Sequence, residues 1–103
     1  MHIIVSWDIS DDDDWDKIDE ELKQCIMDYS WVKPLTTFYI IQIDDSAERS
    51  KIKKSLLNIC QKYKTDINIV ISPIIEEGRY AGWLPKKIWS AIKERTAEEY
   101  NAE

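Results

Sequence analysis

Glycine, proline, histidine and long apolar runs are all scarce in this chain. Its 103 residues include two glycines, three prolines and one histidine. So few turn-forming residues leave no room for a long flexible linker, and we expect one domain. No apolar run approaches the roughly 18 residues of a membrane span, so we expect no membrane association. The opening residues lack the basic and small-residue pattern of a secretory signal, which favours a cytoplasmic protein.

Cysteine and histidine are too sparse to suggest a metal cluster or a catalytic triad. Cys25 and Cys60 are the only cysteines, and their spacing matches no common metal motif. Both fall on apolar faces of predicted helices, which favours reduced core thiols over a disulfide or a reactive site. His2 has no evident catalytic partner nearby, and no glycine-rich phosphate loop is present. These absences argue against the common triad and P-loop enzymes.

The charge is negative overall and unevenly distributed. The net charge of −6 argues against a protein that binds DNA through general positive charge. Nine acids and one lysine lie between Asp8 and Glu21, whereas the basic residues come later. We therefore expect local basic surfaces in spite of the overall sign. The basic residues form two groups, which are Arg49, Lys51, Lys53, Lys54, Lys62 and Lys64, and then Lys86, Lys87, Lys93 and Arg95.

The apolar spacing predicts four strands and three helices. Residues 2–8 alternate, with Ile3, Val5 and Trp7 on one face, which predicts the first strand. Asp45 followed by Glu48 is typical of a helix start. The remaining predictions are a helix from 13 or 14 to about 29, strands at 31–35, 38–43 and 67–72 (the last continuing to 75 past Pro73), a helix from 45 to about 63, and a helix over 86–95.

This order predicts an α+β fold of the ferredoxin-like type, β-α-β-β-α-β with an antiparallel sheet and an extra C-terminal helix. Residues 1–95 would form the domain and residues 96–103 a polar tail. The strand at 38–43 is apolar on both faces. Because two helices cover only one face of such a sheet, we expect the third helix or a second copy to cover the other.

Three short motifs resemble a known family. They are Trp-Asp-Ile-Ser at 7–10, Thr-Thr-Phe at 36–38, and Ala-Gly-Trp-Leu-Pro at 81–85 before a helix that contains Trp89. With the element order, they resemble the small bacterial and phage proteins labelled SinR-family. Those in turn are similar to the small ferredoxin-like subunit of the CRISPR adaptation complex, and more distantly to the virulence-associated D ribonuclease toxins.

The resemblance implies a homodimer and a role for Asp8. In the CRISPR-related proteins the aspartate that ends the first strand, which matches Asp8, approaches its twin across the two-fold axis. In active members this pair holds a divalent metal, Mg²⁺ or Mn²⁺, for phosphodiester hydrolysis, while many others only hold duplex DNA. The family usually has tyrosine where this chain has Trp7. The resemblance thus implies a metal-dependent endonuclease with Asp8 as catalytic residue and metal ligand. The alternative is that Asp8 only caps the strand end.

The basic residues supply candidate nucleic-acid contacts. Lys51, Lys54, Lys86 and Lys87 lie on otherwise amphipathic helices and are the candidate phosphate contacts. Arg79, which stands among aromatic residues, can stack on bases or anchor an interface. It can equally hold the terminal helix against the sheet.

The acidic run predicts a rival function from another class. Asp11, Asp12, Asp13 and Asp14 fit a non-catalytic interaction protein, such as one encoded by a phage, that binds or inhibits a basic nucleic-acid-binding host partner. The same residues also suit the solvated start of a helix. A purely structural dimer is a third alternative.

Overall fold

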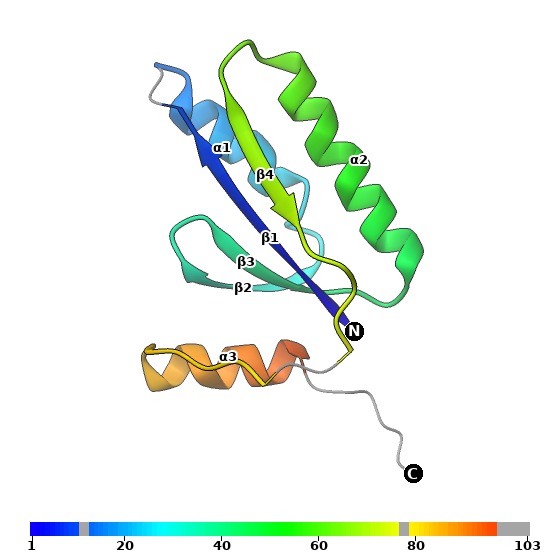
Figure 1. Ribbon diagram of the computed structural model, residues 1–103, viewed down its shortest axis with the longest axis vertical. Helices are drawn as coiled ribbons and strands as arrows, with labels where there is room; N and C mark the ends of the chain where they lie inside the picture. The colour runs from blue at the N-terminus through cyan, green and yellow to red at the C-terminus, as the bar shows by residue number, and fades with distance from the viewer. Residues whose placement is uncertain (11–12, 77–78, 97–103) are drawn as a thin grey trace.

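The computed structural model describes residues 1–10, 13–76 and 79–96, which form one antiparallel sheet and three helices (Figure 1). The sheet order is β2-β3-β1-β4, and each neighbouring pair is antiparallel. This arrangement confirms the predicted α+β fold with a C-terminal helix and is compatible with the ferredoxin-like type. The elements are β1 (His2–Ile9), α1 (Trp15–Gln24), β2 (Ser30–Leu35), β3 (Phe38–Gln42), α2 (Ser46–Lys62), β4 (Ile67–Ile71) and α3 (Lys86–Thr96).

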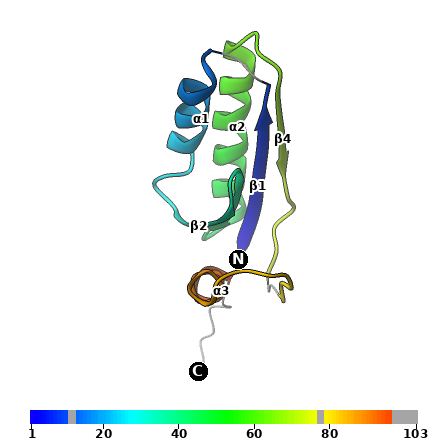
Figure 2. The same ribbon diagram turned by 90° about the vertical axis from the view of Figure 1, so that its left-hand side faces the viewer.

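The central strand β1 contributes side chains to both faces of the sheet. Its side chains alternate between the two faces, and Ile3, Val5 and Trp7 are buried against α1 and α2. Ile18 and Leu22 of α1 fill the same core, together with a buried stripe on α2. Figure 2 shows α1 and α2 side by side along one face of the sheet, with α3 apart from them at one end. The main core therefore lies between the sheet and the first two helices.

The start of α2 follows the predicted cap. Asp45 Oδ1 accepts a hydrogen bond from the Glu48 amide at 3.0 Å, and Glu48 Oε1 accepts one from the Asp44 amide at 2.6 Å. The first bond satisfies an amide of the first helical turn, which has no intrahelical partner, and the second holds the residue just before the cap. The helix then extends to Lys62 and buries Ile52 and Leu56.

The end of α1 differs from the prediction. The helix ends at Gln24 instead of about Tyr29. Beyond it the amides of Cys25, Ile26 and Tyr29 bond to carbonyls three residues earlier. Such tighter turns bring every third residue back to the same side, so Ile26 stays buried although the α-helix has stopped. Apolar spacing alone could not distinguish a continued α-helix from these tighter turns.

The second face of the sheet is partly covered by α3. Ile92 of α3 packs with Val32 of β2 and Ile40 of β3, and all three are buried. This confirms that the third helix covers an apolar sheet face, on its β2–β3 half. The helix extends one residue past the predicted end, because Thr96 is buried and its hydroxyl donates to the Ile92 carbonyl. The rest of the predicted tail, residues 97–103, lies outside the described residues.

The chain leaves β4 and rejoins β1 after a kink, as predicted. Beyond Ile71, Ser72 still pairs with Ile4, and after Pro73 the backbone of Ile75 pairs with His2 in both directions at 2.8 and 2.9 Å.

Among the described helices, none is long and apolar enough to span a membrane.

Candidate functional site

Asp8 lies on the part of the sheet that α3 does not cover. Strand alternation places Ser6 and Asp8 on the face opposite Trp7, and the register sets Asp8 directly across from Asn68 of β4. Asp8 is exposed and lines an open hollow with Ser6 and Asn68. Val70, on the same face, is 72% exposed. The strand continues past Asp8 to Ile9, and the Ser10 amide still bonds to the Asp66 carbonyl. Asp8 is therefore an exposed position within the strand, one residue before its end.

The donors around Asp8 suit a hard cation but are few. The Asp8 carboxylate, the Asn68 amide oxygen and the Ser6 hydroxyl are all oxygen donors, the kind that Mg²⁺ prefers. Across the residues that the structure describes, no group of three histidine, cysteine or acidic side chains comes together. One chain thus brings a single carboxylate to this hollow. Two copies would bring two, which is the number that Mg²⁺ commonly takes from protein.

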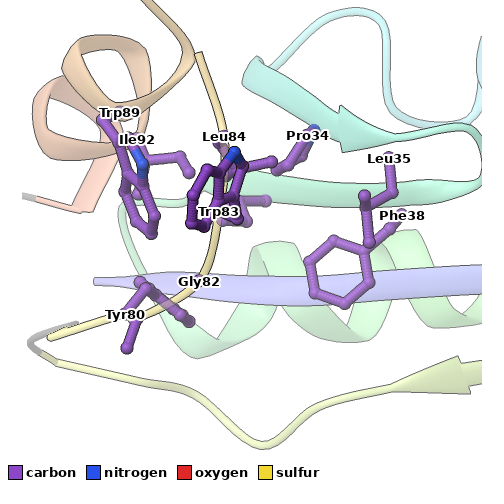
Figure 3. Close-up of a pocket in the computed structure, with 11 residues that line it drawn as sticks. Pro34, Leu35, Phe38, Tyr80, Gly82, Trp83, Leu84, Trp89 and Ile92 are labelled. Atoms are coloured by element: carbon purple, nitrogen blue, oxygen red, sulfur yellow. The ribbon is translucent and has the colours of Figure 1, made fainter. Parts of the chain in front are cut away.

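A second hollow lies between the β2–β3 hairpin and the segment that leads into α3 (Figure 3). Its volume is about 220 Å³, and its lining is almost wholly apolar. Trp83 is 99% exposed and Leu35 is 58% exposed, although both are large apolar residues. Exposed apolar side chains that gather in one place mark a contact surface. The lining residues are Pro34, Leu35, Phe38, Ile40, Tyr80, Ala81, Gly82, Trp83, Leu84, Trp89 and Ile92, which we call the hairpin groove.

The segment beside this groove is tied to β1 by His2. His2 Nε2 and the Tyr80 hydroxyl are 2.6 Å apart, and their rings meet edge to face. His2 is completely buried. Burial, and then the charge of the N-terminal ammonium, lowers the pKa of His2 to about 4, so that the ring is neutral near pH 7. Tyr80 thus ties this segment to β1, a contact that the sequence did not predict, and the neighbouring Arg79 is exposed.

The predicted phosphate contacts form two separate surfaces. Lys51 and Lys54 are exposed on α2, which lies with α1 on one face of the sheet. Lys86 and Lys87 are exposed in the first turn of α3, which packs on the other face. The topology therefore does not bring the two pairs together. Only the α3 pair is close in sequence to the hairpin groove, because it follows Trp83 by three and four residues.

The described acidic residues around α1 form two groups, those exposed at its start and those that contact other elements. Asp13 and Asp14 are exposed at the start of α1, and Asp14 occupies the predicted cap position without making a side-chain cap bond. Asp11 and Asp12 lie outside the described residues. Two acids of α1 itself are used in packing. Asp19 accepts a hydrogen bond from Trp7 Nε1 at 2.9 Å, and Glu21 binds Lys62 at 2.7 Å and the Tyr63 hydroxyl.

The two cysteines are free thiols and are half-buried, and Cys25 packs against the main core. Burial raises the pKa of both Cys25 and Cys60, which keeps them protonated. Since the thiolate is the reactive form, this environment fits the predicted reduced core thiols and not a nucleophile.

No family model matches the chain, and no curated protein matches it.

Proposed function

We propose that the protein is a nucleic-acid-associated homodimer of the CRISPR-adaptation-subunit type, in which Asp8 of each copy binds a divalent cation. The supporting observation is the position of Asp8. It is an exposed carboxylate on an uncovered sheet face, beside the exposed Val70. A cytoplasmic location goes with this proposal, because both cysteines are free thiols.

A second copy is the occupant that best suits this face. A domain of this size buries a modest share of its surface, so covering Val70 and its surroundings adds apolar burial. Most homodimers are two-fold symmetric, so a residue near the axis meets its own copy. An axis close to Asp8 would pair the two carboxylates. Without a cation they would repel each other, which makes cation binding and dimer formation mutually dependent.

Mg²⁺ or Mn²⁺ would be held by the two Asp8 carboxylates. When bound, such an ion supplies positive charge to a phosphodiester group that is being hydrolysed. Ser6 and Asn68 flank Asp8 on the same face, and their hydroxyl and amide groups can donate hydrogen bonds to phosphate oxygens. This is the endonuclease form of the proposal. Lys86 and Lys87, or Lys51 and Lys54, would contact phosphates farther along the strand.

The experiment is a cleavage assay on labelled single- and double-stranded DNA and RNA with Mg²⁺ or Mn²⁺. Wild type is compared with Asp8→Asn, which removes the charge and keeps the size. Asp28→Asn is the matched control, because Asp28 is also exposed but lies in the turn after α1. We expect the wild type and the control to cut and Asp8→Asn not to cut. Light scattering on the same samples reports whether the dimer is intact. Absence of cutting in folded wild type overturns the endonuclease form.

The rival function is supported by the exposed acids at the start of α1. Asp13 and Asp14 are exposed, and the chain carries a net charge of −6. A non-catalytic protein could present them to a basic nucleic-acid-binding partner. Titration with poly-lysine tests this surface, using Asp13→Asn combined with Asp14→Asn. Weaker and less salt-sensitive binding in the double variant would favour the rival, whereas unchanged binding would remove its support.

A further inference from the structure

Trp83 is the most exposed large apolar side chain among the described residues. It is 99% exposed, while Trp89, six residues later, is half-buried against β2 and β3. Tryptophan has a large apolar surface that normally packs in a core or an interface. An indole held out in solvent, on a segment that Tyr80 ties to β1, is therefore available to a partner. Figure 3 shows it beside Tyr80 and Leu84, across the groove from Phe38 and Leu35.

The hairpin groove is small and apolar. Its volume of about 220 Å³ lies below the roughly 300–1,000 Å³ of ordinary ligand pockets. A space of this size suits one flat ring system, with Trp83, Tyr80, Phe38 and Trp89 supplying aromatic surface around it. Aromatic surfaces of this kind are the platforms on which unpaired nucleobases stack.

The charge beside the groove is positive. Lys86 and Lys87 are exposed in the first turn of α3, and no acidic residue lies in that turn. The amino end of a helix also carries partial positive charge. Phosphate is complementary to this surface, although the chain as a whole carries a net charge of −6. Lysine is depleted in protein–protein interfaces, so the pair argues against a second copy or an apolar peptide at this place.

We propose that the hairpin groove binds single-stranded nucleic acid, with one base stacked on Trp83 and the flanking phosphates held by Lys86 and Lys87. This groove proposal rests on the proposed association with nucleic acid and specifies that the nucleic acid is single-stranded. A duplex keeps its bases stacked on each other, so only an unpaired base can reach the indole. Stacking tolerates any base, so binding is expected to depend little on sequence.

The test is fluorescence anisotropy with labelled 12-nucleotide single-stranded DNA and RNA and a matching duplex, in EDTA at low salt. EDTA removes any contribution from a cation at Asp8. We expect Trp83→Ala to weaken single-strand binding by about fivefold to a hundredfold, because a base–aromatic stack is worth about 1–3 kcal/mol. Trp83→Phe keeps an aromatic face and should recover most of the affinity. Since Trp83 is almost fully exposed, neither variant should disturb folding.

The charge variants complete the test. Lys86→Ala combined with Lys87→Ala should weaken binding and flatten its dependence on salt. The matched control is Lys53→Ala combined with Lys64→Ala, which removes the same charge from exposed positions on and after α2. The control should bind like wild type. Equal losses in both double variants would mean general charge attraction and would overturn the assignment to this groove.

The other outcomes decide between this inference, the proposed function and a contact between copies. If only the duplex binds, or Trp83→Ala binds single strands as wild type does, the groove proposal fails while nucleic-acid association stands. If the folded wild type cuts nothing but Trp83→Ala specifically loses single-strand binding, the endonuclease form fails and the groove proposal stands. If light scattering shows that Trp83→Ala dissociates a dimer, the groove is instead a contact between copies, and the proposal is overturned.

Discussion

His2 and Tyr80 lie 78 residues apart in the chain, and their side chains meet in a hydrogen bond of 2.6 Å. His2 is the first residue of β1 and is fully buried, while Tyr80 belongs to the segment between β4 and α3. The contact therefore connects the central strand to the wall of the hairpin groove. Among the described residues, His2 Nδ1 has no hydrogen-bond partner. A buried ring with only one partner stabilises the fold only while it is neutral.

The first prediction concerns the pH dependence of stability. The pKa of folded His2 is about 4, below the 6.5 of an unfolded histidine, so the unfolded chain binds the proton first. Stability from the neutral ring is thus complete above pH 6.5 and is lost as the pH falls toward 4. The loss should reach roughly 3 kcal/mol in the free energy of unfolding near pH 4.

Urea unfolding at pH 7 and at pH 4.5 measures this loss. Carboxylates also make stability depend on pH in the acid range. Lys62 and Tyr63 lower the pKa of Glu21, so protonation of Glu21 at low pH also destabilises the fold. The His2→Phe variant carries the same carboxylates and serves as the reference. We expect wild type to lose more stability between the two pH values than His2→Phe does. Equal losses in the two proteins would contradict the assignment to His2.

The sequence predicted the fold wherever a local pattern and the tertiary structure agree. Alternation in β1 and the Asp45–Glu48 cap are local signals, and both are confirmed. The end of α1 was wrong because turns with three-residue bonds keep the apolar spacing of a helix. The register across from Asp8 depends on strands far apart in sequence, so its neighbour Asn68 had no local signal.

The hairpin groove was missed for a related reason. Tryptophan in a short chain is normally assigned to the core, and four of the five here are at least half-buried. Trp89 lies within the helix predicted over 86–95 and Trp83 lies before it, but neither position tells how far the indole is exposed. The closest signals were the motif at 81–85 that contains Trp83 and the aromatic residues around Arg79. The separation of Lys51 from Lys86 likewise follows only from the faces on which α2 and α3 pack.

The second prediction concerns the Tyr39 hydroxyl. Tyr39 is 1% exposed, stacks on Trp7 at 4.8 Å, and has no hydrogen-bond partner for its hydroxyl within the described residues. Burial, followed by the charges of Asp19 and Glu20, raises its pKa to about 12. Because an unpaired buried hydroxyl is unfavourable, Tyr39→Phe should be neutral or stabilise the protein by up to about 1 kcal/mol. Thermal unfolding measures this. A loss above 1 kcal/mol would reveal a partner for the hydroxyl.

The third prediction concerns the cap of α2. Asp45→Ala removes the acceptor of the Glu48 amide and should lower the free energy of unfolding by about 1 kcal/mol. Asp45→Ser keeps an acceptor and should recover most of that loss. Asp44→Ala is the matched control, because Asp44 contributes only its backbone amide to the cap. Denaturant titration of the three variants checks the ranking, and equal stabilities for Asp45→Ala and Asp44→Ala would contradict it.

The fourth prediction tests the open sheet face as the contact between copies. Val70 is 72% exposed beside Ser6 and Asp8, so changing it to glutamate should cost the monomer little stability. In a dimer through this face, Val70→Glu would place two more carboxylates near the axis. They would repel each other and the Asp8 pair, so we expect Val70→Glu to be monomeric by light scattering. Asn58→Glu adds the same charge on the exposed side of α2 and should leave the dimer intact. A dimer that survives Val70→Glu must use another surface, and Asp8 would then have no twin to share a cation with.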